Sequence, residues 1–176
     1  MMTLFWIAQA LGVVAVIIQV VTYQRNNRKD ILLGVMSAQI LFVVHFIMLG
    51  GYTGAAVNTI GALRNLIFAK SKKIIKSTLL LWVFLLIQLA VALLTWQGLL
   101  SVLALFGSWF STLAFWQSNP RNIRRLIIFM PLCWLAYNFF ISSYVGMASN
   151  IFVFVSTLIA IYRFDFAPKE AREKIL

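Results

Sequence analysis

Seven long apolar runs, separated by short polar links, organise this chain. The runs cover residues 4–23, 31–49, 52–69, 77–96, 98–117, 124–141 and 145–163. Each is close to the length of about 20 residues that an α-helix needs to cross a bilayer. Their apolar residues are continuous rather than alternating, which favours helices over a barrel. The pattern predicts an all-α integral membrane protein with seven transmembrane helices.

The links between the runs alternate in character, and this predicts an orientation. The polar and basic links are 24–30, 70–76, 118–123 and 164–176. The tips around Gly50, Gly98 and Ser142 are short and uncharged. All 15 Lys and Arg residues, and all four acids, fall in or beside the basic links. By the positive-inside rule that side is cytoplasmic, so the N-terminus is predicted outside and the C-terminus inside.

Composition agrees with a membrane domain and narrows the partners. The chain is 62% hydrophobic and 11% charged, whereas a soluble domain is about half apolar and a quarter charged. Its net charge of +11 is confined to short clusters between apolar runs, a pattern of membrane topology rather than of nucleic-acid binding. The expected partner of these clusters is the anionic headgroup layer at the cytoplasmic face. Cys133 is the single cysteine, so neither an internal disulfide nor a thiolate metal cage is expected.

The single membrane domain, 1–176, contains an internal repeat. Tyr-x-Gly-x-Ala-x-Asn occurs at 52–58 and again, 92 residues later, at 144–150. The predicted units are two triple-helix bundles at 4–69 and 98–163, joined by a connector helix at 77–96 and followed by a cytoplasmic tail at 164–176. Three spans per unit plus one connector give both units the same orientation. This is a parallel repeat about an axis along the membrane normal, as found among transporters.

The 3+1+3 plan, with an Asn in the third helix of each bundle, resembles the SWEET and PQ-loop transporters. The resemblance implies a solute pathway between the bundles, and it implies that Asn58 and Asn150 contact the substrate. The link that begins Gln19-Val-Val-Thr-Tyr-Gln is similar to a PQ loop, but Ile18 stands where that family has proline. In the second unit Ser111-Thr112 replaces the dipeptide.

Over nearly its whole length the chain more closely resembles the YgjV-type bacterial inner-membrane proteins, a family whose function we regard as unassigned. The features that carry the resemblance are Leu-Phe-Trp-Ile-Ala-Gln at the start, Val-Val-His45-Phe-Ile-Met-Leu-Gly, Gly-Ala-Leu-Arg64-Asn65, Gly107-x-x-x-Ser-Thr-Leu-Ala-Phe and Cys133-Trp-Leu-Ala-Tyr-Asn138-Phe. The resemblance implies a multi-pass protein of the bacterial inner membrane.

Polar side chains inside the predicted spans are candidates for substrate binding, because a polar group in lipid must face a partner or water. Asn58 and Asn65 share one face of the third span, and Asn150 occupies the position of Asn58 in the second unit. His45 and Tyr137 are counterparts, 92 residues apart, at a depth similar to that of Asn58 and Asn150. We predict that His45, Asn58, Tyr137 and Asn150 form one layer, with Asn65 on the same stripe. Hydrogen bonding that only holds the helices together is the alternative interpretation.

Two more positions are candidates for gating, and one arginine has two interpretations. Gln39 and Pro131 are counterparts in the second and sixth spans, and Pro131 is expected to kink its helix. A static bend, compensated by neighbouring helices, is the alternative.

Arg64 is predicted to extend to the cytoplasmic headgroups. Alternatively it lines the inner vestibule and attracts anions.

The function predicted is a SWEET-like facilitator for a small, polar, uncharged solute that passes between the two bundles. The alternative is a non-transporting inner-membrane scaffold or assembly protein that retains the fold. An enzyme is not expected, because the predicted spans contain no acid and the chain has no P-loop or zinc pattern. No cofactor or metal is expected either, and the sequence does not set the oligomeric state.

Overall fold

The computed structural model describes residues 2–23, 28–70, 77–117, 120–162 and 166, and all regular structure within these ranges is helical. Several predictions fall outside the described residues. These are the tail at 164–176 apart from Phe166, and the basic residues Arg25, Lys72, Lys73, Lys76, Arg163, Lys169, Arg172 and Lys174.

The helices follow the predicted runs closely. Their bounds are α1 (Met2–Tyr23), α2 (Arg28–Met48), α3 (Tyr52–Lys70), α4 (Thr78–Leu94), α5 (Leu99–Trp116), α6 (Pro120–Ile127), α7 (Phe129–Phe140) and α8 (Tyr144–Ile161). The sixth predicted run corresponds to both α6 and α7, which are separated at Ile128. Local signals agree with the helix starts, since the Ser77 and Ser143 hydroxyls accept hydrogen bonds from the first turns of α4 and α8.

Three stretches of the described chain are long and apolar enough to cross a membrane. They are Met2–Gln19, Leu99–Trp116 and Arg121–Phe140. Three further apolar helices are shorter, at Leu32–Met48, Thr78–Leu94 and Tyr144–Ile159. Helix α3 belongs to neither group, because Asn58, Arg64 and Asn65 interrupt its apolar sequence, and all three are buried. Its polar residues therefore face protein rather than lipid.

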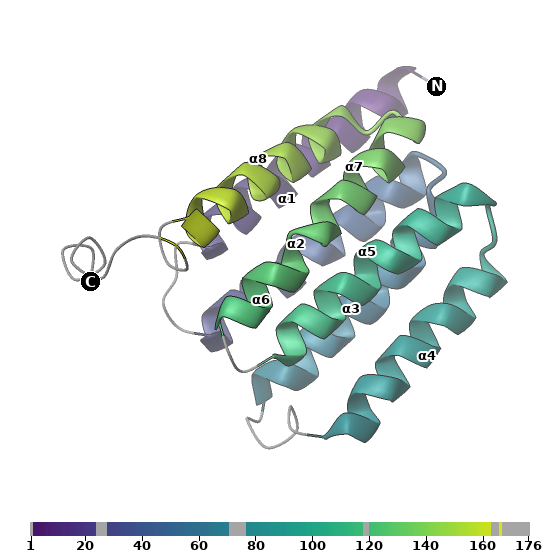
Figure 1. Ribbon diagram of the computed structural model, residues 1–176. Coiled ribbons are helices and arrows are strands. Elements are labelled where there is room, and N and C mark those ends of the chain that lie inside the picture. Colours follow the sequence, from purple (N-terminus) through teal and green to yellow (C-terminus); the bar gives the residue numbers. More distant parts are fainter. Residues whose placement is uncertain (1, 24–27, 71–76, 118–119, 163–165, 167–176) are drawn as a thin grey trace.

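The helices form two layers (Figure 1). One layer has the order α1, α2, α3, and the other has α8, α7 with α6, and α5. The layers meet along two edges, where α1 packs against α8 and α3 packs against α5. Helix α4 lies beside α3 and α5 at one side of the bundle. The central helices α2 and α7 have little backbone contact with each other, which leaves room between the layers.

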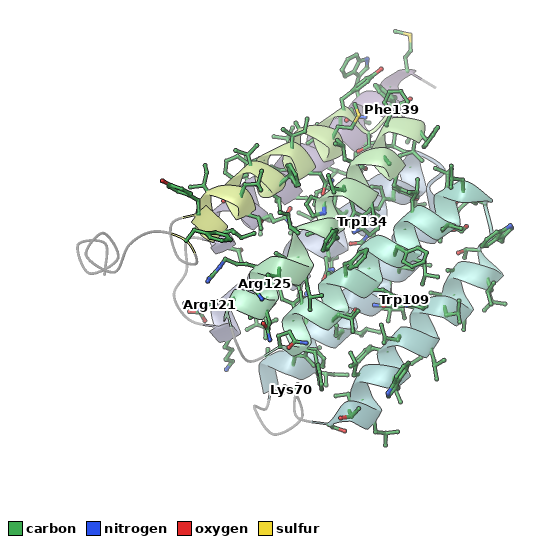
Figure 2. The ribbon with its side chains drawn as sticks, in the orientation of Figure 1. Lys70, Trp109, Arg121, Arg125, Trp134 and Phe139 are labelled. Carbon is green, nitrogen blue, oxygen red and sulfur yellow. The ribbon has the colours of Figure 1, made fainter. Side chains whose placement is uncertain are left out.

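The two ends of the bundle differ in chemistry. In Figure 2, Lys70, Arg121 and Arg125 lie at one end and Phe139 lies toward the other. We call these the basic end and the turn end, the latter carrying the α2–α3 turn and the α7–α8 turn. Large apolar side chains cover the flanks: Leu79 is 74% exposed and Leu94 is 84% exposed. Such flanks suit a lipid environment.

The two turns at the turn end share an unusual backbone conformation. Gly50 in the α2–α3 turn has φ 75°, and Ser142 in the α7–α8 turn has φ 55°. Only a few per cent of residues other than glycine adopt this left-handed region. The two positions are 92 residues apart, the same spacing as the sequence repeat.

A glutamine from another helix holds each of these turns. Gln97 Nε2 donates to the Gly50 carbonyl (2.9 Å), and Gln97 Oε1 accepts from the Thr53 amide (3.2 Å). Gln9 makes the same two bonds to the other turn, donating to Ser142 O (3.1 Å) and accepting from Val145 N (3.3 Å). We call these the glutamine clamps. Each satisfies a backbone donor and a backbone acceptor at a helix end, where partners are otherwise missing.

Candidate solute-binding cavity

A cavity lies between the two layers, where α2 and α7 face each other. About 80 Å³ of it is open to the centre of a water molecule, and one water needs about 10–15 Å³, so a small solute fits. Its polar lining consists of Gln19, Gln39, Asn58, Ser108, Ser111, Asn138, Ser149 and Asn150. Its apolar lining consists of Val35, Ala38, Phe42, Phe46, Phe115, Met130 and Trp134. An apolar wall with convergent polar groups is typical of a ligand site.

The two repeat asparagines line this cavity with matching geometry. Asn58 Nδ2 donates to the carbonyl of Gly54 (2.9 Å), and Asn150 Nδ2 donates to the carbonyl of Gly146 (2.8 Å). Because a carbonyl oxygen only accepts, each amide nitrogen must face its own helix. Each side chain therefore keeps its Oδ1 and one Nδ2 hydrogen for a ligand. Asn58 comes from α3 and Asn150 from α8, so the cavity brings together one repeat asparagine from each layer of helices.

Asn138 is a cavity residue that sequence reasoning missed. Its side chain is 1% exposed, and its Oδ1 is buried without a hydrogen-bond partner. This oxygen packs against α8, since a Cβ at Gly146 would lie 2.5 Å from it, so Asn138 lines the cavity with other parts of its side chain. The repeat gave no signal, because its counterpart 92 residues earlier is Phe46. Only its neighbour Tyr137 was singled out from the sequence.

Gln19 and Ser149 were also missed as site residues. They line the cavity from α1 and α8, and Ser149 Oγ donates to Gln19 Oε1 at 3.4 Å. Both were visible as polar residues in predicted helices, but Gln19 was interpreted only as part of a resemblance to the PQ loop. Their bond joins the two layers along the α1–α8 edge.

Gln39 lines the cavity, whereas Asn65 lies behind it. Gln39 Oε1 accepts a hydrogen bond from Asn65 Nδ2 at 2.9 Å. Asn65 is fully buried and is not part of the lining. Gln39 packs closely over Gly61, which lets the long amide lie flat between α2 and α3. Asn65 thus supports a cavity residue instead of facing the cavity.

Arg64 does not extend to the headgroups, so that prediction is wrong. Its side chain is 0% exposed. Its Nε and Nη2 both donate to Asn65 Oδ1 (3.1 and 3.0 Å), and its Nη1 donates to Ser111 Oγ (3.2 Å) and Thr112 Oγ1 (2.6 Å). The guanidinium also lies 5.3 Å from the ring centre of Phe115. Ser111 and Phe115 line the cavity, so the cation lies directly behind its wall.

Helix α4 joins this polar network through Gln88, a residue that sequence reasoning missed. Gln88 is fully buried, and its Nε2 donates to Thr112 Oγ1 at 3.0 Å. Ser111 and Thr112 also donate to the carbonyl of Ser108. Helix α5 therefore presents a polar face to Arg64 and the cavity. Gln88 was unremarkable in sequence because it is one polar residue in a strongly apolar run.

His45 and Tyr137 do not line the cavity, although both are close to its turn end. Tyr137 is fully buried, and its hydroxyl accepts from the Gly54 amide at the start of α3 (3.0 Å). His45 Nδ1 lies 2.6 Å from the Ala8 carbonyl, and its Nε2 lies 2.7 Å from Ser143 Oγ at the start of α8. Each residue thus contacts a helix start in the opposite layer.

The partners of His45 assign its protons. The Ala8 carbonyl only accepts, so Nδ1 carries a hydrogen and donates. Ser143 Oγ accepts from the Gly146 amide (3.2 Å) and donates to Nε2 of the neutral ring. A neutral imidazole is therefore fully satisfied here, which fits the structural interpretation of His45.

An aromatic cluster closes the cavity toward the turn end. Phe46 and Trp134 stack in parallel, with ring centres 5.7 Å apart. Tyr137 meets both edge-on, at 5.5 and 5.4 Å, and Phe42 stacks on Phe46 at 5.8 Å. These rings come from α2 and α7, the two helices whose backbones stay apart. At the turn end these rings fill the space between α2 and α7, whereas nearer the basic end smaller polar side chains leave that space open as the cavity.

Pro131 lies beside an interruption of its helix, as expected. Helices α6 and α7 separate at Ile128, three residues before the buried Pro131. Proline has no amide hydrogen for the carbonyl four residues earlier, and its ring clashes with that carbonyl. Met130, next to Pro131, lines the cavity. The break therefore occurs where α7 begins to contribute to the cavity wall.

Comparisons with known proteins place the chain. The family described as "Bacterial inner membrane protein" (Imp-YgjV) matches residues 6–167. This chain belongs to the Imp-YgjV family. Inner membrane protein YgjV of Escherichia coli (strain K12) is 30% identical over 152 residues, which cover 82% of this chain and 77% of that relative. No solved structure matches the chain.

Family membership and the apolar helices together place this protein in the bacterial inner membrane as a multi-pass protein. The predicted family and compartment are thus confirmed. The family description states a location and no activity. The chemistry of the cavity is the guide to function.

Proposed function

We propose that this protein is a membrane facilitator that passes a small polar solute between its two layers of helices. The observation that carries the proposal is the cavity between α2 and α7, with Asn58 and Asn150 on opposite walls. Carboxamides in a membrane interior are costly unless they have partners or water. A central cavity that gathers five of them, Gln19, Gln39, Asn58, Asn138 and Asn150, is suited to replacing the hydration of a solute.

The proposed architecture is a 3+1+3 repeat of seven spans with α4 as connector. Two observations support it. Helices α2 and α3 begin at Arg28 and Tyr52, and α6 and α8 begin 92 residues later at Pro120 and Tyr144. The contact between α1 and α8 also corresponds, after exchange of the two units, to the contact between α5 and α3. Solute pathways between such units are a known transporter design.

The proposed orientation puts the basic end in the cytoplasm and the turn end outside. The glutamine clamps, the His45 and Tyr137 contacts and the aromatic cluster then all lie on the outer side. The conformation described here is accordingly closed toward the outside. An alternating-access cycle would have to separate these contacts, while the basic end closes.

The first test is solute flux into liposomes that contain the purified protein. We expect flux of at least one solute from a panel of sugars, amino acids, hydroxy acids and nucleosides, and a loss of about tenfold or more in Asn58→Ala/Asn150→Ala. The matched control is Thr59→Ala, which removes the same kind of bond, from Thr59 Oγ1 to the Ala55 carbonyl (3.0 Å), on an exposed face. If a folded protein passes no solute, the scaffold alternative takes the place of this proposal.

Pro131 and Gln39 are proposed to act in gating. In Pro131→Ala, residue 131 regains an amide hydrogen for the Ile127 carbonyl, so α6 and α7 should join into a stiffer helix. We expect equilibrium binding of the transported solute to stay within about twofold, and flux to fall about tenfold, which corresponds to a barrier higher by about 1.4 kcal/mol. Binding and liposome flux should be measured on the same preparation. Unchanged flux would make the break a static bend.

A further inference from the structure

We propose that the cavity binds a small carboxylate that also carries hydroxyl or ammonium donors, with its donors toward the asparagines and its carboxylate toward Arg64. This deepens the proposed function and rests on it for the transport step. It replaces the expectation of an uncharged solute, because Arg64 is buried behind the cavity wall instead of extending to the headgroups.

The asparagine part of the cavity offers acceptors. Asn58 and Asn150 each use one amide hydrogen on Gly54 or Gly146, so the Oδ1 and one amide hydrogen of each remain for a ligand. Asn138 also lines the cavity, with its Oδ1 buried against Gly146. The two carboxamide oxygens, from α3 and α8, suit a group with N–H or O–H donors on both sides.

A buried cation, Arg64, lies behind the opposite wall of the cavity. The Arg64 guanidinium donates to Ser111 Oγ and lies against Phe115, and both of these side chains line the cavity. Among the described residues that line the cavity, all are neutral. In a low-dielectric interior the field of such a charge extends across several ångströms. A carboxylate in the cavity is therefore favoured over a neutral group of the same shape.

The separation between the two parts fits a molecule of a few carbon atoms. Asn58 and Arg64 are six residues apart on α3, which is about 9 Å along a helix axis. Arg64 acts through Ser111, a residue of the cavity wall to which it donates, so the distance that a ligand must span ends at the wall and not at the guanidinium. A three- to five-carbon hydroxy acid or amino acid has the required length, and the cavity volume of about 80 Å³ open to water centres is consistent with it.

The experiment measures equilibrium binding to the full chain in detergent by titration calorimetry, with four matched probes. Glycerate and L-serine carry a carboxylate and donors, glycerol carries donors without a carboxylate, and propionate carries a carboxylate without donors. We expect glycerate or L-serine to bind at least about tenfold more tightly than both glycerol and propionate. The same ranking should appear when the probes compete for liposome flux.

Two variants separate the two ends of the site, with Thr59→Ala as the control. Arg64→Met should remove the preference for glycerate over glycerol. Asn138→Leu removes an acceptor that has no protein partner, so its fold should persist, while binding of the preferred probe should weaken about tenfold. A structural role for Asn138 alone would leave binding unchanged and alter only the melting temperature.

The outcomes distinguish this inference from the proposed function. Glycerol that binds or passes as well as glycerate would overturn the carboxylate inference and leave a facilitator in place. Failure of every solute in the flux panel, in a protein that is folded, would overturn both. Preference for a carboxylate with donors, lost in Arg64→Met or Asn138→Leu, would support both.

Discussion

Replacing Gly54 with alanine should destabilise the protein by about 2–3 kcal/mol, because the new methyl group has no space. A Cβ at this position would lie 2.6 Å from Cζ and 2.7 Å from Cε1 of Tyr137, and closer still to its hydroxyl oxygen. Tyr137 is fully buried, stacks among other rings and accepts the Gly54 amide hydrogen, so it has no free direction in which to move. Overpacking then outweighs the gain of about 1 kcal/mol that alanine brings to a helix.

The measurement is reversible unfolding in mixed micelles, where the free energy of unfolding is compared between variants. Ala148→Ser is the matched control: it also adds one heavy atom to a helix, but at an exposed position, and should change stability by less than about 0.5 kcal/mol. The double variant Gly54→Ala/Tyr137→Leu should lose less than the two single changes added together, since the smaller side chain removes the clash. Simple additivity would show that Gly54 and Tyr137 are not in contact.

Arg64→Lys should destabilise the protein by about 3 kcal/mol, more than the apparently harsher change Arg64→Met, at about 1–2 kcal/mol. The guanidinium spans Asn65 on one side and Ser111 and Thr112 on the other. A lysine ammonium keeps the buried charge but is a single point that reaches only one of these sides. Methionine removes the charge, and the hydroxyls of Ser111 and Thr112 still donate to Ser108. Asn65 Oδ1 is then the main acceptor that loses its donors.

Unfolding in the same micelles tests this order, with the two variants and the wild type measured side by side. If the Arg64→Lys variant were more stable than the Arg64→Met variant, the ammonium would be making enough hydrogen bonds. The planar, forked geometry of the arginine side chain would then not be needed. Such a result would also imply that position 64 is closer to water than its complete burial indicates.

Helix positions were largely predictable from the sequence, because long apolar runs and basic links constrain them directly. The apolar runs placed the starts of the third and seventh spans at residues 52 and 145, and α3 and α8 begin at Tyr52 and Tyr144. Layer order was not predictable, since periodicity shows which residues are polar but not which helix they face. The fate of Arg64 illustrates this. Hydropathy places it near a helix end, and only the packing of α3 against α5 buries it.

The candidate site was predictable where the repeat and the chemistry agreed. Asn58, Asn150 and Gln39 line the cavity. His45 and Tyr137 have a similar role, but it is to connect opposite layers of helices. Each forms a hydrogen bond with a helix start in the other layer instead of lining the cavity. Asn138 was not predicted to line the cavity, since its counterpart 92 residues earlier is Phe46.

The glutamine clamps have a consequence for how relatives should be compared. Gln9 and Gln97 make the same pair of bonds to equivalent turns, yet they are 88 residues apart rather than 92, so they are not equivalent positions of the chain. What the two turns share is a pair of backbone groups that need a side-chain amide, and several nearby positions can supply one. A homologue without glutamine at position 9 has therefore not necessarily lost its clamp. The two repeat units of these proteins, and this family and its distant relatives, are better aligned by the backbone groups that are hydrogen-bonded than by residue identity.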